Sequence, residues 1–454
     1  MIAVQATHRA HSGQRGQVLV LGMVLVGLAL VAFARYFSAG QVVASRVRQS
    51  HALDAAAYSG ALVQARALNM LAYLNRAQMG HHVAMAHLVT LASWAHFAGT
   101  EAQQRGRGNP PTHLISMLFG ADHGAAYAAA SRATSMRADA GESGRLGAAY
   151  AAHNRTVQHV LTTAQHQVVQ SLPHAREQAM RAVLRESFAP APGQGAETRD
   201  DSFILTVAND TWPAFVQRNP GQDLRPFLLD IAGLYQFLDR RDHTARNNWV
   251  VSSRCPSRRH ELRRRGTTQL DGAGRWQSID TQSFHALRSN RWIGCYFREY
   301  AMGWGWIPAA ATHQLADPYV ENPPENFSSQ DFWRWVREST RWDIHGGNAN
   351  PLANSRAVSQ RQRWSGAGLQ AYFDIRNPGS SAVGFSATLE RTYRDARNHT
   401  DGMRVHTRSA AETFFVRPEP RTDRRRESAN LFRPYWQARL SSRLAGMLAD
   451  GSMP

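Results

Sequence analysis

The sequence has 454 residues, enough for two or three domains, and 43% of them are hydrophobic, which is enough for a sizeable core. Its formal charge is +18, and all 52 basic residues are arginine because the sequence contains no lysine. A phosphate-binding P-loop, a protein-kinase site and Schiff-base catalysis each need a lysine, so these three classes are excluded. We attribute the arginine excess to biased base composition. The alternative is a surface that pairs with phosphates or carboxylates.

An uncharged apolar stretch runs from Val18 to Ala34. A helix over it is roughly 25 Å long, and the hydrocarbon core of a bilayer is about 30 Å thick. Tyr36 and Phe37 extend the stretch, and Arg35 can reach the interface. We therefore predict a transmembrane helix over residues 18–37. A cleaved signal peptide and a buried helix of a soluble protein are the alternatives.

The orientation of this helix is nearly balanced by charge. Two arginines precede the apolar stretch and three come soon after it (Arg9 and Arg15, then Arg35, Arg46 and Arg48). The start amine adds a positive charge on the N-terminal side, so the positive-inside rule gives almost a tie. A signal-anchor so close to the N-terminus usually translocates the chain on its C-terminal side. We expect residues 1–17 in the cytoplasm and the bulk of the chain across the membrane.

Residues 38–188 have the composition of a helical, membrane-proximal region. The part from 41 to about 100 contains no proline, and Pro110 and Pro111 then interrupt it. A second helical stretch, Leu146 to Phe188, contains Pro173, which we expect to kink or break it. Its apolar residues recur at helical spacing, and we interpret them as packing against another helix of the chain rather than a partner. These residues are Val157, Leu161, Ala164, Val168 and Leu172.

The character of the chain changes after a linker-like segment at 189–201. Eleven of the twelve tryptophans lie beyond residue 200. Alternating runs predict strands over Leu369–Ile375 and Phe385–Tyr393, with a turn at Asn377–Gly379 between them. Residues 202–420 are therefore expected to form a mixed α/β domain, and 421–454 a basic C-terminal tail, in which Arg421–Arg426 is charged and solvated. The predicted fold class is α+β: a transmembrane helix, a long helical region and a strand-containing extracytoplasmic domain.

The two cysteines, Cys255 and Cys295, fit no zinc motif. In a reducing compartment they would be two buried thiols. In an oxidising compartment we expect a disulfide, which would stabilise the fold by roughly 3–4 kcal/mol in the chain-entropy model.

Several near-motifs lack an essential part. His260–Arg264 begins like a zinc-protease helix but has arginine where the second histidine belongs, and Gly366–Ala371 precedes a strand-like run instead of a helix. We interpret four histidines in the first helical region as surface or helix-packing residues (His81, His82, His87 and His96). We expect no catalytic, cofactor or metal site. Arginines between 254 and 265, with nearby tryptophans, could bind nucleic acid or sugars, but we favour a solvated loop over a tryptophan-rich core.

Two short segments flank the apolar stretch. Directly before it stand Arg15, Gly16 and Gln17; after it, the string Arg48–Ala61 holds an aspartate followed by small residues that end in Gly-Ala (Asp54, Gly60 and Ala61). Small residues permit close helix–helix approach in or beside a membrane. Together, the first 65 residues resemble the N-terminal region of TadE/TadG-like proteins of the Flp (Tad) pilus-assembly system. Pro434–Leu440 is also similar to a tail common in such proteins.

The resemblance implies a single-pass protein of the bacterial inner membrane with its bulk in the periplasm. It implies a role, with other assembly proteins as partners, in building or anchoring an adhesive type IV-like pilus or a related secretion apparatus. It does not imply catalysis. The alternative function is an envelope protein that binds anionic or sugar polymers, based on the arginines and tryptophans after residue 200. A nucleic-acid partner is not expected.

Two departures from the family limit what the resemblance implies. Some relatives carry a von Willebrand-type metal site with the pattern D-x-S-x-S, which Asp280–Ser283 does not fit. Prepilins have glutamate at the fifth position after the cleaved glycine, where this chain has Leu21 after Gly16 and Val18 after Gly13. We therefore expect neither that metal site nor processing by a prepilin peptidase.

Overall fold

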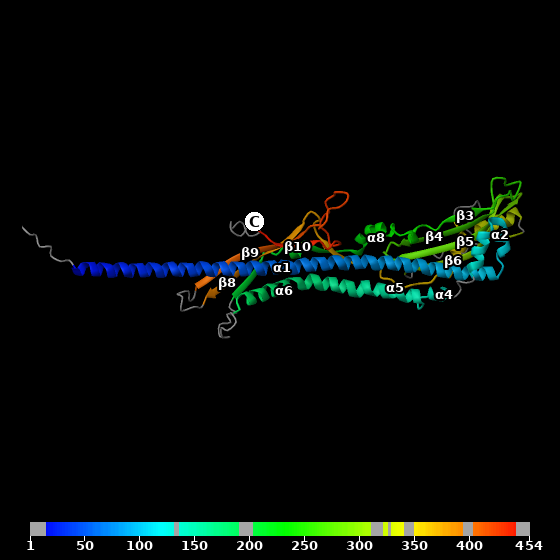
Figure 1. The fold of residues 1–454 in the computed structure, drawn as a ribbon. Coiled ribbons are helices and arrows are strands. Elements are labelled where there is room, and N and C mark those ends of the chain that lie inside the picture. The colour runs from blue at the N-terminus through cyan, green and yellow to red at the C-terminus, as the bar shows by residue number, and fades with distance from the viewer. Residues whose placement is uncertain are drawn as a thin grey trace, which may run out of the picture.

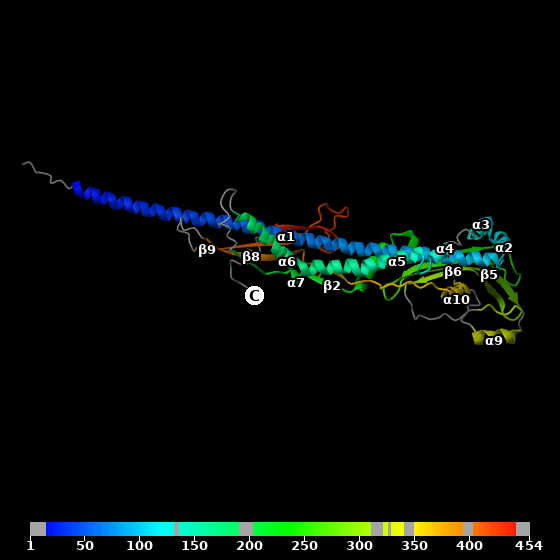
Figure 2. The ribbon, with the colours of Figure 1, turned by 90° about the horizontal axis from the view of Figure 1, so that it is seen from below.

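One helix organises the whole molecule. The computed structural model describes residues 15–130, 136–189, 203–309, 321–325, 328–339, 349–393 and 403–441. Helix α1 spans Arg15–Gly106 without interruption, so its 92 residues extend over roughly 138 Å. Its N-terminal part projects beyond all other elements (Figures 1 and 2). The apolar stretch and the helical region predicted up to residue 100 are thus parts of one continuous helix.

The chain turns at the distal end of α1 and returns beside it. α1 ends at Gly106, and Pro110 and Pro111 lie between it and the three short helices that make the turn, so the predicted interruption is present. A continuous helical run then lies along α1 (Figure 2). The turn consists of α2 (Thr112–Phe119), α3 (Ala121–Ala129) and α4 (Met136–Asp139). The returning run consists of α5 (Arg145–Arg155), the π-helical turn Thr156–Leu161 and α6 (Thr162–Ser187).

The apolar stripe of the returning helix faces α1, as predicted. Val157 and Leu161 cluster with Leu74 of α1, and Leu172 lies in a cluster with Leu68 and Leu71. Of the kink or break expected at Pro173, the break is absent, because α6 continues through it to Ser187, and the returning helix bends within α6 (Figure 2). A proline lacks the N–H that would bond the carbonyl four residues earlier, here that of Val169. The indole N–H of Trp212 donates to that carbonyl instead, at 3.3 Å.

Three antiparallel sheets lie one after another along α1, with sheet A nearest the projecting end and sheet C at the distal end (Figure 1). Sheet A has the strand order β1 (Phe203–Ala208), β8 (Ala382–Tyr393), β9 (Met403–Phe415) and β10 (Trp436–Leu440). Sheet B pairs β2 (Val216–Asn219) with β7 (Tyr372–Ile375). Sheet C has the order β3 (His243–Arg246), β4 (Glu261–Leu270), β5 (Trp276–Asn290) and β6 (Gly294–Pro308).

Short helices connect the strands of these sheets. They are α7 (Trp212–Phe215), η4 (Gly221–Leu224), α8 (Arg225–Ala232), η5 (Gln236–Leu238), α9 (Ser329–Ser339) and α10 (Pro351–Ser359). The two predicted strands are present as β7 and β8, but they belong to different sheets and do not pair with each other. The α+β composition is therefore as predicted from the sequence.

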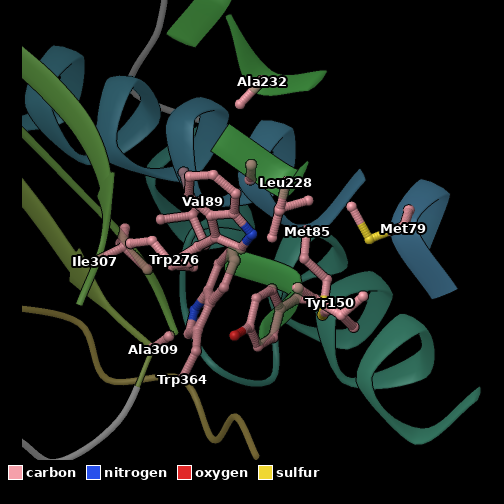
Figure 3. Close-up of a cluster of buried hydrophobic side chains, with 14 of the residues drawn as sticks. Met79, Met85, Val89, Tyr150, Leu228, Ala232, Trp276, Ile307, Ala309 and Trp364 are labelled. Carbon is pink, nitrogen blue, oxygen red and sulfur yellow. The ribbon is translucent and has the colours of Figure 1, made fainter. Parts of the chain in front are cut away.

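The hydrophobic core extends along α1 as a series of clusters. In the middle of the molecule, Met85 and Val89 of α1 meet Tyr150 of α5, Trp276 of β5 and Trp364 (Figure 3). Because each sheet buries its inner face against the helix, the strand-containing half is not a separate globule beyond the helical half.

The C-terminal segment is exposed where solvation was expected and folded beyond it. Arg424, Arg425 and Arg426 are exposed, but Leu431 and Trp436 are buried, and β10 completes the edge of sheet A. The alternating strand pattern around Trp436 buries one face, which net charge alone does not reveal. The predicted linker at 189–201 lies outside the described residues apart from Ala189.

Candidate functional site: an apolar span, a polar spine and a basic distal end

The first turns of α1 present apolar side chains to the surroundings on every side. The large apolar residues from Val18 to Phe33 are 52–72% exposed. The helix is long and apolar enough to cross a membrane by length and composition, and no other part of the described chain covers this segment. Burying such a surface in lipid removes a large hydrophobic penalty. This segment is a candidate membrane span, and its first residues Arg15, Gly16 and Gln17 are helical.

A short stalk without fully buried side chains separates this span from the first buried contact with the folded body, and Gln41, Val42 and Ser45 within it are half-buried. The first buried contact of α1 with a sheet is made by Gln49, roughly 22 Å along the helix from Ala34. The side-chain amide of Gln49 donates to the carbonyls of Leu389 at 3.0 Å and Val405 at 2.8 Å. Sheet A therefore begins at a fixed distance from the apolar segment.

Further polar side chains of α1 bond to the backbone of each sheet. Gln64 donates to the Val383 carbonyl of sheet A at 3.0 Å. Asn75 donates to the Phe373 carbonyl of sheet B at 2.8 Å. In sheet C, the Thr100 hydroxyl donates to the Trp304 carbonyl at 2.6 Å and accepts from its N–H at 2.8 Å. Buried polar groups are costly unless paired, so these bonds select one register of each sheet on the helix.

The family-like residues lie where α1 packs on sheet A and α6. The Ser409 hydroxyl donates to Asp54 at 2.6 Å, and the Thr413 hydroxyl donates to the Ala61 carbonyl at 3.0 Å. A Cβ on Gly60 would lie 2.9 Å from Cγ of Met180 and 3.0 Å from Cζ of Phe385. The small residues thus permit close approach as predicted, but to a sheet as well as to a helix, and outside the apolar segment.

Asp280, in the sequence Asp280–Ser283, is the centre of a buried ion-pair cluster. Asp280 is fully buried in β5 and accepts hydrogen bonds from Arg241 at 2.9 Å, Arg264 at 3.0 Å and Ser93 of α1 at 2.6 Å. The Arg264 guanidinium also lies 3.5 Å from the centre of the Phe97 ring. The carboxylate is therefore fully engaged, and the centre ties sheet C to the helix.

The expectation of a solvated arginine loop is wrong for part of the 254–265 run. Arg263 and Arg264 lie in strand β4, where Arg263 is buried and bonds Glu261 at 2.7 Å. The same glutamate bonds Arg246 at 2.8 Å. Guanidinium groups can stack on aromatic rings and pair with carboxylates, so arginine can occupy an inward position in this strand. Arg254, in the preceding loop, is exposed as expected.

Two histidines of α1, His82 and His96, are buried inside the molecule, whereas His87 is exposed. Both ring nitrogens of His82 and of His96 are buried without a hydrogen-bond partner in the described part of the chain. Burial lowers the pKa of each to about 4. His81 lies with its Nδ1 2.7 Å from Nδ1 of His153. Within the described ranges, no group of three or more His, Cys, Asp or Glu side chains could hold a metal ion.

Glu101 is a further buried ionisable group, near the distal end of α1. Burial raises the pKa of Glu101 to about 8, while the charge of Arg264 acts in the opposite direction. The Gln282 amide donates to its carboxyl group at 3.0 Å. Gln282 belongs to strand β5 and Glu101 to α1, so this hydrogen bond joins sheet C to the helix.

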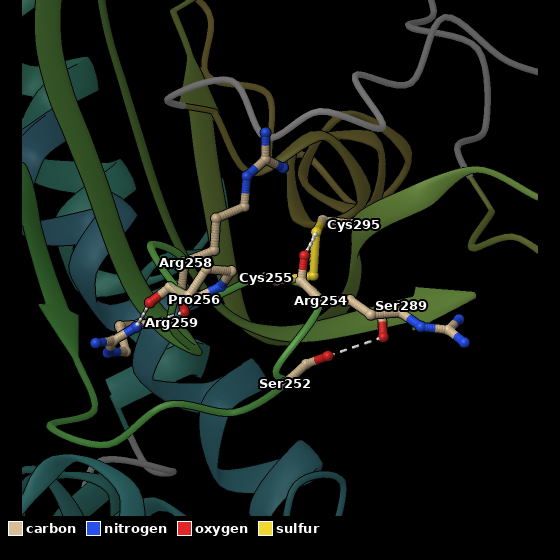
Figure 4. The surroundings of a disulfide bond; sticks show 8 residues. All are labelled: Ser252, Arg254, Cys255, Pro256, Arg258, Arg259, Ser289 and Cys295. Carbon is tan, nitrogen blue, oxygen red and sulfur yellow. Dashed lines mark hydrogen bonds between the residues drawn. A yellow bond between two sulfur atoms is a disulfide. The ribbon is translucent and has the colours of Figure 1, made fainter. Parts of the chain in front are cut away.

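A disulfide joins Cys255 to Cys295, with a Cα–Cα distance of 6.0 Å. It connects the loop after β3 to the start of β6 at the distal end of sheet C (Figure 4). The side chains of Arg254, Arg258 and Arg259 extend from this loop in different directions (Figure 4). The bond thus restrains an arginine-rich loop at the end of the molecule opposite the apolar span.

A groove of about 430 Å³ lies beside this loop, between α2 and sheet C. Its lining combines apolar residues of both elements with Arg288 and His260. Sequence reasoning missed this groove, the Asp280 centre and the polar side chains of α1, because each joins segments more than a hundred residues apart. A signal in the sequence was the recurrence of glutamine and asparagine along α1 among small and apolar residues, as at Gln49, Gln64 and Asn75.

Comparison with protein-family models, curated proteins and solved structures finds no match for this chain. The class of protein is therefore defined by the structure alone: an α+β protein built on one long helix with an apolar N-terminal segment and a disulfide at its other end.

Proposed function

We propose that this protein is a membrane-anchored structural component of a Flp (Tad) type IV-like pilus or a related secretion apparatus. The observation that carries the proposal is the continuity of α1, which runs from the exposed apolar segment through the folded body to the distal end. A continuous helix transmits position and orientation over its full length, as a scaffold part requires. The resemblance of residues 1–65 to TadE/TadG-like proteins supports this assignment.

In the proposed arrangement, residues 18–37 cross the inner membrane and the body stands in the periplasm. The Cys255–Cys295 disulfide supports this location, since disulfides persist in the periplasm and are rare in the cytosol. The stalk before Gln49 holds the body away from the lipid surface. The fully engaged Asp280 and the packed histidines support a structural role rather than a catalytic one.

The test is a chromosomal deletion complemented with stalk variants. Ala44 is exposed in the stalk, so Ala44→Pro interrupts α1 before its first buried contact with the body, whereas Ala44→Ser leaves the helix intact. We expect the deletion strain to lose pili or secretion, Ala44→Ser to restore them, and Ala44→Pro to fail despite normal protein levels. Unchanged piliation, adhesion and secretion in the deletion strain would rule out the proposed function.

A further inference from the structure

The distal end of the molecule concentrates positive charge. Residues 247–260 and 286–296 meet there through the disulfide, and together they contain five arginines and no acidic residue. The nearest acid in sequence, Glu261, is occupied by Arg246 and Arg263. Arg254 and Arg288 are exposed and have no ion-pair partner within the described residues. This positive charge is therefore available to an external partner.

The groove next to these arginines is aromatic and apolar. Its floor is a row of three rings, in which Phe284 lies 5.6 Å from His260 and 5.8 Å from Tyr300 between centroids. Met117 of α2 and Trp249 also line the groove, yet they remain 61% and 46% exposed. An apolar side chain entering the groove would cover both of them.

The groove is held in shape before any partner arrives. The Asn247 side chain is buried; its amide donates to the Trp249 carbonyl at 2.8 Å, and its oxygen accepts from the His260 N–H at 2.7 Å. His260 in turn accepts from the Leu287 N–H through Nδ1 at 2.9 Å. These bonds, together with the disulfide, fix the loop that carries Trp249. Little ordering entropy is therefore lost when a partner binds.

We propose that this groove is a docking site for a partner protein, which inserts an apolar side chain flanked by carboxylates. Tryptophan, methionine and arginine are enriched in protein interfaces, while aspartate and glutamate are depleted, which is the composition seen here. The apolar floor suits a side chain better than a glycan or phosphate polymer, and Arg288 beside it suits a carboxylate. The inference rests on the proposed function only in placing the partner within the same assembly.

The binding test uses the full-length protein in lipid nanodiscs and three fluorescent peptides. The first alternates glutamate or aspartate with leucine and phenylalanine. The second replaces its acids with glutamine, and the third replaces its apolar residues with serine. We expect only the first to bind well, and each replacement to weaken binding about tenfold or more. Arg288→Glu should weaken binding of the acidic peptide, whereas Arg218→Glu, at the exposed position of strand β2, should not.

Two results would overturn the docking site. The first is equal affinity for all three peptides, or equal affinity of the Arg288→Glu and Arg218→Glu variants. The second is that the serine peptide and heparin each bind as tightly as the first peptide. This result would mean that the distal end binds polyanions through charge alone. Piliation does not enter this assay. Absence of peptide binding therefore rejects the docking site and leaves the proposed function standing. Normal pili in the deletion strain would reject the proposed function and leave the docking site standing.

Discussion

Asn69 and Trp436 exchange two hydrogen bonds across 367 positions of sequence: the Asn69 amide donates to the Trp436 carbonyl, and the Trp436 N–H donates to Asn69 Oδ1, each at 3.0 Å. A side chain of α1 thus takes the place of a neighbouring strand for the first residue of β10. The C-terminal segment joins the fold through the helix as well as through sheet A.

We expect Asn69→Ala to detach β10 locally and to lower the free energy of unfolding by about 1–3 kcal/mol, since a buried donor and acceptor are left unpaired. Hydrogen exchange of residues 436–440, with denaturant unfolding in detergent, measures both effects. Arg66→Ala, at an exposed position of the same helix, is the control. Equal exchange of β10 in the two variants would contradict the assigned role.

Gly60 and Gly80 give a matched pair for testing the packing of the family-like segment. Both lie within α1, but a Cβ at Gly60 meets Met180 and Phe385, whereas one at Gly80 meets nothing within 4 Å. Alanine favours a helix over glycine by about 1 kcal/mol, and overpacking costs about 1–3 kcal/mol. We therefore expect Gly80→Ala to raise the unfolding free energy and Gly60→Ala to lower it, measured by denaturant titration. Stabilisation by both would show that the close approach is absent.

His82 makes stability sensitive to acid. Burial, with the charge of His81, lowers the pKa of His82 to about 4 in the folded protein, below the ordinary value of 6.5. The unfolded chain then binds the proton more readily, so stability is present above pH 6.5 and is lost as the pH falls toward 4. Glu101 has a raised pKa and acts in the opposite sense, losing stability as the pH rises toward 8.

We expect His82→Leu to reduce the stability loss between about pH 7.5 and about pH 5, because the group that must charge is gone. Denaturant unfolding at the two pH values measures the difference. His51→Leu, at an exposed position of the same helix, should keep the pH dependence of the unaltered protein. The same pH dependence in both variants would show that His82 does not carry the effect.

The Cys255–Cys295 bond closes a loop with a sequence separation of 40. Replacing both cysteines with serine should lower the unfolding free energy by roughly 3–4 kcal/mol. Reductant should produce a similar loss in the unaltered protein and none in the double variant, as measured by thermal unfolding. A reductant effect that persists in the double variant would show that the bond is not its source.

Much of the helical architecture is determined by local sequence. The apolar stretch after Gln17, the absence of proline up to residue 100 and the stripe through Val157 and Leu172 each obey a helical period, so short windows contain the information. The strands β7 and β8 were likewise readable from alternation. The order of the strands in the three sheets could not be predicted from the sequence, because strand pairing depends on contacts between distant segments.

Only the tertiary structure decided what the polar and charged residues do. Arg264 reads from sequence as a solvated cation, yet it lies inside sheet C because Asp280, Phe97 and Trp94 surround it. Nothing local to Gln49 indicates a partner, yet its side chain bonds the backbone of sheet A. By itself, the sequence determined the apolar span, the long helices and the absence of lysine chemistry, since these depend on composition and local period. The groove, the ion-pair centre and the placement of the sheets along α1 depend on residues far apart in the chain, whose partners only the folded structure brings together.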